Sequence, residues 1–388
     1  MIFIKNGNIF TMAGDIIEKG SILIKDGKIL EVGKDLVAPL DAKVIDAGGR
    51  MVVPGFIDAH CHLGMWEEGI GFEGSDGNEM VDPVTPHLRA IDGINPMDIS
   101  FAEAYKGGVT TAVTGPGSAN VIGGMFVALK TYGKRVDDMI IKEPIAMKIA
   151  FGENPKRVYN GLKKSPMTRM ATAAMLRENL FKAEAYLEKK ELGKEDPSKM
   201  PEYDMKMEAL AKVLNKEIPL KAHAHRADDI FTAIRIAKEF DLDITLDHCT
   251  EGHLIADYLA EEGKPAIVGP TLSNRSKFEL QNLTFDTPKV LNEAGVKIAI
   301  TTDSPVIPLQ YLPVCAGLAA KSGLEEMEAL KAITINAAEI TGIDDKVGSI
   351  EVGKDADIVI FDGNPIKNID CKTYITIING EVVYQNIN

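Results

Sequence analysis

The 388-residue sequence has little of several features that would assign it to a particular class of protein. Its four cysteines form no Cys-x-x-Cys pair, so we expect neither a disulfide framework nor a cysteine-rich zinc site. Reduced thiols indicate a cytoplasmic protein. No apolar run reaches the ~18 residues of a membrane-spanning helix, and the N-terminus lacks the apolar core of a signal peptide, so secretion is not expected.

Positive charge is also scarce. The chain has 43 Lys and Arg against 57 Asp and Glu, a net charge of −14, and no basic cluster offsets it. Because a nucleic-acid-binding protein needs a basic face for phosphates, we expect no nucleic-acid partner. We expect a small-molecule substrate and no membrane partner, and we leave open a homo-oligomer.

The two ends of the chain share a pattern of short β-rich runs separated by turn residues. Residues 1–51 and 347–388 both show it, with Asn-Gly and Asp-Gly turns between the runs. Neither end has enough strands to bury a core alone. We therefore predict a small β-sandwich domain composed of both termini.

Residues 52–346 alternate short apolar runs with helical patterns, which predicts an α/β fold with a parallel sheet. The length favours a TIM-type (β/α)₈ barrel, with a doubly wound open sheet as the alternative. Residues 163–216 are rich in Met, Lys and Glu and predict either a solvated helical hairpin or a lid over the barrel mouth. The glycine-rich residues 115–124 lack phosphate-loop spacing, so we expect a mobile loop there.

One stretch, residues 52–62, points to metal chemistry. It is an apolar run that ends in His60-Cys61-His62. Side chains two apart on a strand share a face, so both imidazoles can bind one divalent ion. The alternative is a pair of buried, hydrogen-bonded histidines.

Other candidate ligands follow later strand-like runs. These are His223 and His225 after residues 220–222, His248 after 244–246 and Asp303 after 298–300. Barrel enzymes place catalytic residues at the C-terminal ends of different strands. Chance alone is a poor explanation for this recurrence.

The run Pro54 to His62, with the later histidines and aspartate in that order, resembles the amidohydrolase superfamily. The likeness covers nearly the whole chain and is greatest to the imidazolonepropionase-like and Xaa-Pro-dipeptidase-like branch. It implies that His60, His62, His223, His248 and Asp303 are metal ligands. It also implies that Asp303 is the catalytic group, which takes a proton from the attacking water.

Three further residues are candidate substrate contacts. His225 has the strand position to face inward, and the resemblance makes it a substrate contact or a support for a ligand. His87 belongs to the long loop after the first barrel strand, which overhangs the site in relatives. Arg275 can bind a carboxylate bidentately, although a structural role explains it equally well.

A bridging ligand would join two metal ions. Relatives use either a carboxylated lysine on the fourth barrel strand or a glutamate near its end, and this sequence offers Lys148 and Glu153. A plain ammonium has no lone pair, so Lys148 would bind only as its carbamate. We leave both open, with a single-metal site as the third case, and expect one or two divalent ions, Zn²⁺ first among them.

The leading hypothesis is a metal-dependent hydrolase that cleaves a C–N bond in a small amide or cyclic amide. A dipeptidase and a heterocycle deaminase are the enzymatic alternatives. Deaminating relatives carry a Glu shortly after the ligand that corresponds to His223, and none occurs here. A non-enzymatic binding or assembly protein would be expected to have lost ligands, and this chain has kept all five.

Overall fold

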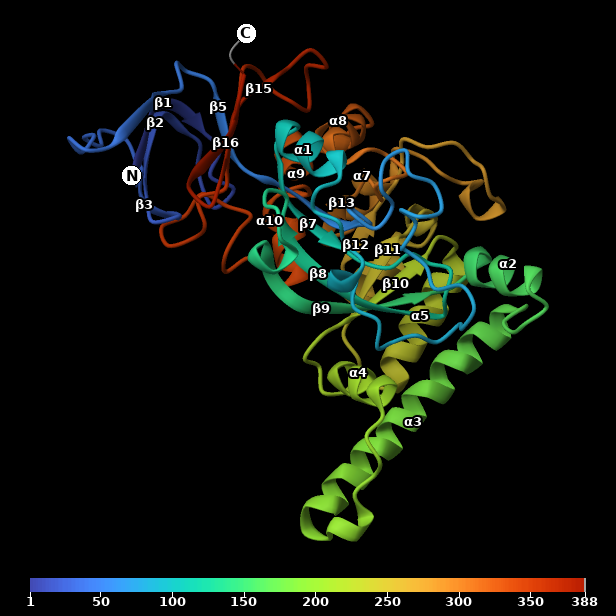
Figure 1. The fold of residues 1–388 in the computed structure, drawn as a ribbon. Coiled ribbons are helices and arrows are strands. Elements are labelled where there is room, and N and C mark those ends of the chain that lie inside the picture. Colours follow the sequence, from blue (N-terminus) through green and yellow to red (C-terminus); the bar gives the residue numbers. More distant parts are fainter. Residues whose placement is uncertain (387–388) are drawn as a thin grey trace.

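A computed structural model describes residues 1–386, which are arranged around two eight-stranded sheets. In Figure 1 the sheet that contains β1 and β16 lies at one end of the molecule, and the other sheet lies among the helices. We call the end of the central sheet that carries the C-terminal ends of its parallel strands the mouth.

Strands from both termini form the first sheet, in the order β16-β15-β14-β5-β1-β2-β3 with β4 beside β1. Its core is rich in isoleucine from both ends of the chain. The sequence predicts a β-sandwich built from both termini. Strands from both termini do pair, but hydrogen bonds join them into one continuous sheet instead of the two sheets of a sandwich. The strands are β1 (Ile2–Ile9), β2 (Ile17–Lys25), β3 (Lys28–Gly33), β4 (Lys43–Asp46), β5 (Met51–Pro54), β14 (Ile358–Phe361), β15 (Thr373–Ile378) and β16 (Glu381–Gln385).

The run 52–62 is divided between the two sheets. Its first part, β5, pairs with β14, and its second part begins the central sheet. Gly55 separates them, and a Cβ at this position would lie 1.9 Å from Oγ1 of Thr110. Only glycine lets the chain pass this close to its neighbour.

The central sheet has its strands in sequence order, from β6 to β13, and is nearly closed. Seven strands are parallel in direction, and β8 is antiparallel to both neighbours. The strands are β6 (Phe56–Cys61), β7 (Val109–Thr114), β8 (Ile122–Lys130), β9 (Ile140–Ala150), β10 (Leu220–Ala224), β11 (Ile244–His248), β12 (Ala266–Val268) and β13 (Ile298–Ile300).

This topology corrects two expectations. A doubly wound sheet is wrong, because the strand order runs around the sheet without reversing. The glycine-rich loop is also shorter than expected, because Gly123 and Gly124 belong to β8. A parallel crossover needs a dozen or more residues, and only residues 115–121 separate β7 from β8, so β8 must run antiparallel.

Asp58 connects the two ends of the central sheet. Its carboxylate accepts hydrogen bonds from the hydroxyl of Thr301 at 2.6 Å and from the backbone N–H of Thr302 at 2.9 Å. These residues directly follow β13, so the bonds link β6 to β13. They hold the first and last strand ends, and the side chains they carry, in one place.

Ten helices connect the strands of residues 1–386. Capping residues start several of them; Asp204, for example, accepts from the N–H groups of Lys206 and Met207. The helices are α1 (Ile99–Lys106), α2 (Glu153–Gly161), α3 (Arg169–Glu195), α4 (Met205–Leu214), α5 (Ala227–Glu239), α6 (Ala256–Glu262), α7 (Thr287–Glu293), α8 (Leu312–Lys321), α9 (Glu326–Lys331) and α10 (Ile335–Thr341). No helix in this part of the chain combines the length and apolar character needed to span a bilayer.

The helical hairpin formed by α3 and α4 points away from the mouth. Arg169 pairs with Asp229 at the start of α5, and Arg177 pairs with Glu239 at its end. The first turns of α3 therefore run alongside α5, and the rest projects beyond the barrel (Figure 1). Of the two expected roles, the solvated hairpin fits this position and the lid does not.

Candidate metal centre

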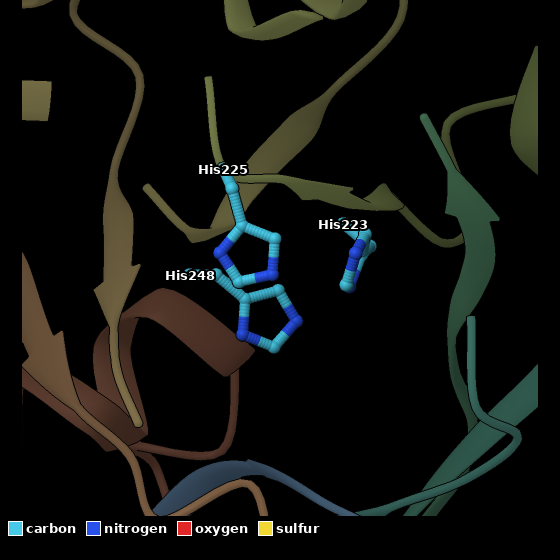
Figure 2. Close-up of side chains that lie close together, drawn as sticks. All are labelled: His223, His225 and His248. Atoms are coloured by element: carbon cyan, nitrogen blue, oxygen red, sulfur yellow. The ribbon is translucent and has the colours of Figure 1, made fainter. Parts of the chain in front are cut away.

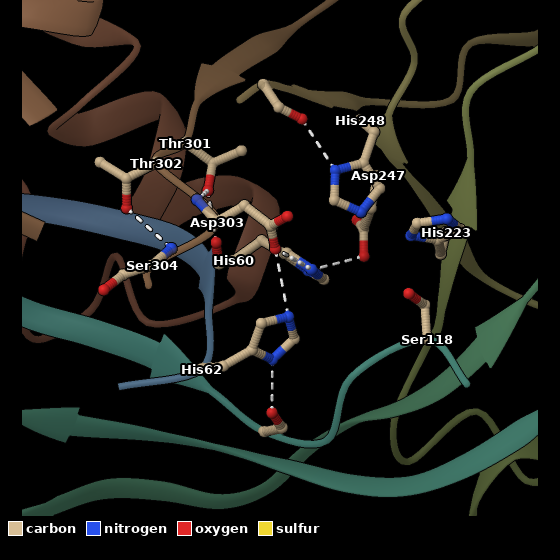
Figure 3. Close-up of polar contacts among 12 residues, drawn as sticks. His60, His62, Ser118, His223, Asp247, His248, Thr301, Thr302, Asp303 and Ser304 are labelled. Atoms are coloured by element: carbon tan, nitrogen blue, oxygen red, sulfur yellow. Dashed lines mark hydrogen bonds and ion pairs between the residues drawn. The ribbon is translucent and has the colours of Figure 1, made fainter. Parts of the chain in front are cut away.

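Side chains from the first strand of the central sheet, β6, and from the residues after its last strand, β13, meet at the mouth. His60, at the end of β6, has its Nε2 atom 3.6 Å from Oδ1 of Asp303, and Nε2 of His62 lies 3.1 Å from the same oxygen. Figure 3 shows the three residues around one point. Their ligand atoms are close enough together to hold one metal ion.

A second group comes from β10 and β11. The ring centroids of His223 and His248 are 4.3 Å apart, and those of His225 and His248 are 4.7 Å apart (Figure 2). These three histidines also form a group that can hold a metal ion. The rings of His60 and His248, 5.0 Å apart, join the two groups.

Burial keeps these imidazoles neutral. Desolvation lowers the pKa values of His60, His223 and His248 well below the usual range, and it lowers the pKa of His225 to about 3. A metal ligand must offer an unprotonated nitrogen lone pair. All four rings are in that state at neutral pH.

Backbone carbonyl groups set the orientation of two rings. Nδ1 of His62 lies 2.7 Å from the oxygen of Gly115, and Nδ1 of His248 lies 2.8 Å from the oxygen of Gly269. A carbonyl oxygen only accepts, so the hydrogen of each ring is on Nδ1 and the lone pair is on Nε2. This is the arrangement that supports a metal-binding histidine.

The backbone is strained at two candidate ligands. His248 has a φ of +73° and Asp303 a φ of +53°. Both values lie in the left-handed region that residues other than glycine rarely adopt. The turn at His248 also explains how it and Asp247, neighbours on a strand, both reach His60. Strain of this kind gathers at functional sites.

The residues present fit a metal ion. Two buried atoms of the cluster, Nδ1 of His223 and Oδ1 of Asp303, have no hydrogen-bond partner within residues 1–386. Buried polar atoms are almost always satisfied, and an ion is one explanation for an exception. Neutral imidazoles with a carboxylate are the donor set that zinc prefers.

Lys148 and Glu153, the two candidate bridging ligands, lie in different surroundings. Lys148 is fully buried on β9, and its Nζ atom is 3.1 Å from Nε2 of His60. Burial lowers the pKa of Lys148 to about 8. Glu153 begins α2, and within residues 1–386 its only hydrogen bond outside the helix is from its backbone N–H. The structure brings Lys148, and not the Glu153 carboxylate, into contact with another candidate ligand, His60.

A cavity of about 520 Å³ opens onto the histidines. Its floor includes His62, His223, His225 and Asp303. The walls add small polar side chains and apolar groups, namely Asn78, Ser118, Asn154, Ser273, Asn274 and Ser276 with Trp66, Leu272, Leu280 and Val306. The volume suits a small molecule.

Two predicted substrate contacts lie off this cavity. The guanidinium group of Arg275 donates to the carbonyl oxygens of Gln281 and Leu283 at 3.0 and 2.6 Å, so it holds its own loop together. His87 lies in a loop that adjoins β8 and does not line the cavity. Of the three predicted contacts, only His225 lines it.

The sequence reasoning missed a lysine and a glutamate. Among residues 1–386, Lys277 is the only Lys or Arg that lines the cavity, and its Nζ atom donates to Asn154 at 3.0 Å and to Glu279 at 3.1 Å. Oε1 of the buried Glu279 is 4.0 Å from Nε2 of His223 and 3.8 Å from Nε2 of His225. Both lie in the segment after β12, Lys277 in a loop and Glu279 in a short 3-10 helix (Phe278–Leu280), where no strand end marked them.

The sequence reasoning also passed over Asp247, which is fully buried beside His60. A signal was present, because Asp247 is a charged residue within an otherwise buried strand, like Lys148 and Lys221.

Comparison with known proteins agrees with this geometry. The family model of the amidohydrolase family matches residues 51–383. The crystal structure of an amidohydrolase from Thermotoga maritima MSB8 shares 44% identity with a TM-score of 0.96, and the match covers 100% of both chains.

Two curated relatives are similar over most of this chain. Amidohydrolase tasK from Hapsidospora irregularis is 30% identical over 89% of this chain, which spans 38% of that relative's length. Imidazolonepropionase from Streptococcus sanguinis is 27% identical, and the match covers 92% of this chain and 87% of the relative.

Proposed function

Because this chain belongs to the amidohydrolase family, we propose that it is a metal-dependent hydrolase that cleaves a C–N bond in a small amide or cyclic amide. The observation that carries this proposal is the convergence of neutral imidazoles and the Asp303 carboxylate at the barrel mouth. We propose zinc as the metal, because nitrogen and carboxylate donors suit it. The free thiols support a cytoplasmic setting.

His60, His62, His223, His248 and Asp303 would hold the ion or ions, with Lys148 as the bridging ligand in its carbamate form. A divalent ion bound there polarises a carbonyl group and lowers the pKa of water. The contacts of Lys148 support it over Glu153. The place of His225 on the cavity floor supports a contact with substrate.

Asp303 is the proposed general base. Its Oδ1 atom is buried, has no hydrogen-bond partner within residues 1–386 and lies beside His62. The Asp303 carboxylate accepts a proton from water as the water oxygen bonds to the carbonyl carbon of the substrate. The same carboxyl group then donates the proton to the nitrogen as the C–N bond breaks, which balances the reaction.

A heterocycle deaminase is the second candidate. Its weakness in sequence was the lack of a Glu close after His223. The fold supplies a carboxylate from elsewhere, since Glu279 lies within 4.0 Å of that histidine. Ammonia release from aminated heterocycles, compared with ring opening of cyclic amides and cleavage of Xaa-Pro dipeptides, separates the candidates.

Elemental analysis of the purified protein tests the metal. We expect near two divalent ions per chain in the native protein, fewer in Lys148→Met and an unchanged number in Glu153→Gln. Absence of metal, with no activation by added zinc, manganese or cobalt, would contradict the proposal. Equal loss in both variants would reinstate Glu153 as a ligand.

A further inference from the structure

A carboxylate inside the barrel contacts a candidate ligand and two lysines. Asp247 is fully buried on β11. Its Oδ1 atom accepts from the hydroxyl of Thr245 at 3.0 Å and from Nζ of Lys221 at 3.3 Å. Its Oδ2 atom lies 2.9 Å from Nδ1 of His60 and 3.9 Å from Nζ of Lys148 (Figure 3). Four strands, β6, β9, β10 and β11, thus meet at one side chain.

We propose that Asp247 is a positioning residue that holds His60 in the tautomer required for metal binding. This inference rests on the proposed function, since it assigns the support of one of its ligands. A carboxylate paired with lysine accepts hydrogen bonds and donates none. It therefore favours a hydrogen on Nδ1 of His60 and leaves the lone pair on Nε2, the atom that faces Asp303.

His60 differs in this respect from the other oriented ligands. Neutral backbone carbonyl groups face Nδ1 of His62 and His248, whereas a charged group faces Nδ1 of His60. Nδ1 of His60 and Oδ2 of Asp247 are 2.9 Å apart, so the contact has a strong electrostatic component. A charged partner raises the basicity of the ring it contacts, which strengthens a metal ligand.

The ammonium group of Lys221 explains why this carboxylate has to be charged. Lys221 is buried beside Lys148 on paired strands. Within residues 1–386, Asp247 is the only carboxylate within 4.0 Å of the Lys221 ammonium group, whether Lys148 is unmodified or in its carbamate form. An unpaired buried charge is costly. Asp247 is therefore placed to do two things: to balance charge and to orient His60.

Paired variants separate these two roles. Asp247→Asn removes the charge and introduces an amide that both donates and accepts. Lys221→Met removes the cation and keeps the contact with His60. The double variant Asp247→Asn with Lys221→Met removes both charges, so it carries the test even if Asp247→Asn alone does not fold. Asp357→Asn, at a buried Lys–Asp pair distant from the histidines, is the matched control.

The zinc dissociation constant and the melting temperature are the two measurements. We expect Asp247→Asn to bind zinc about 10–100-fold more weakly, the usual effect of losing such a support, and to melt at a lower temperature. The double variant should recover melting temperature but not zinc affinity. Lys221→Met and Asp357→Asn should lose melting temperature while zinc affinity stays near that of the native protein.

Recovery of native zinc affinity in the double variant would overturn the inference, because Asp247 would then be only a counter-ion for Lys221. The ¹⁵N shifts of the histidine rings in metal-free protein give an independent readout. We expect Nδ1–H for His60 in the native protein and a mixture of tautomers in the double variant. A native protein that binds no zinc would contradict the proposed function alone, and identical His60 tautomers in both proteins would overturn the inference alone.

Discussion

Two buried clusters of lysine and aspartate can be compared in this protein. One joins the barrel to the terminal sheet, where Nζ of Lys130 lies 2.9 Å from Asp355 and 2.7 Å from Asp357. The other lies beneath the mouth, around Asp247 and Lys221. Lys130 and Asp357 are buried at the junction, as Lys221 and Asp247 are beneath the mouth, so neither residue type nor the burial of these pairs distinguishes the two clusters.

Hydrogen-bond saturation, meaning that each buried polar atom has a partner, does distinguish the two clusters. At the junction, Asp357 also accepts from the backbone N–H of Asn379, and Asp355 also pairs with Lys28 at 2.6 Å. At the mouth, Nδ1 of His223 and Oδ1 of Asp303 have no hydrogen-bond partner within residues 1–386. A satisfied network holds the fold together, whereas unpaired buried atoms among candidate ligands are a sign that an ion binds there.

The largest effect is expected from a substitution at the mouth cluster that removes the unpaired carboxylate of Asp303. Asp303→Asn should fold normally and lose turnover by about 10²–10⁴-fold, because an amide cannot take the proton of water. Steady-state kinetics on a hydrolysed substrate, with circular dichroism to check folding, measures this. A folded variant with native kcat would place the general base elsewhere.

The matching change at the saturated cluster should affect stability instead. Lys130→Met leaves two carboxylates without their shared cation, and breaking a buried pair from one side costs about 3–5 kcal/mol. Denaturant unfolding gives the free energy, and elemental analysis should find the native metal content. Loss of metal with stability unchanged would reverse the assignment of the two clusters.

A cavity lysine offers an intermediate case. Lys277 uses two of its three N–H donors on Asn154 and Glu279 and lines the cavity. We expect Lys277→Gln to raise KM about 10–150-fold, since one lost hydrogen bond to a charged group is worth about 1.5–3 kcal/mol. Lys289→Gln, a surface change on α7, is the control. Equal KM values for both variants would show that Lys277 does not contact substrate.

The smallest effect is a pH dependence at the junction. Burial acts to raise the pKa of Asp355, but its ion pairs with Lys130 and Lys28 outweigh burial, and the net pKa is below 3.8. The folded state therefore releases this proton more readily than the unfolded state. The contribution to stability is present above about pH 4 and disappears as the pH falls through the lowered value. Melting curves from pH 6 to 3 should show a smaller acid shift in Lys130→Met, and an equal shift in both proteins would place the acid sensitivity elsewhere.

The convergence of the candidate ligands at the strand ends was predictable from sequence because their signal is local. An apolar run that ends in a histidine or aspartate identifies the strand and the residue at its mouth together, as at His60, His223, His248 and Asp303. The pairing of both termini in one sheet was predictable for a similar reason, since neither end has enough strands to bury a core alone.

Tertiary structure decided the rest, because the deciding contacts join segments far apart in the chain. Lys277 reaches the cavity and Glu279 reaches the histidines from a segment whose path no pattern predicts, and Arg275, two residues before Lys277, turns away to satisfy its own loop. The direction of β8 followed from a short connection and not from its composition. The role of Asp247 depends on closure of the barrel, which brings its carboxylate within 2.9 Å of His60. The sequence alone does not identify this contact, because the partner of a charged residue in a strand depends on the register of the neighbouring strands.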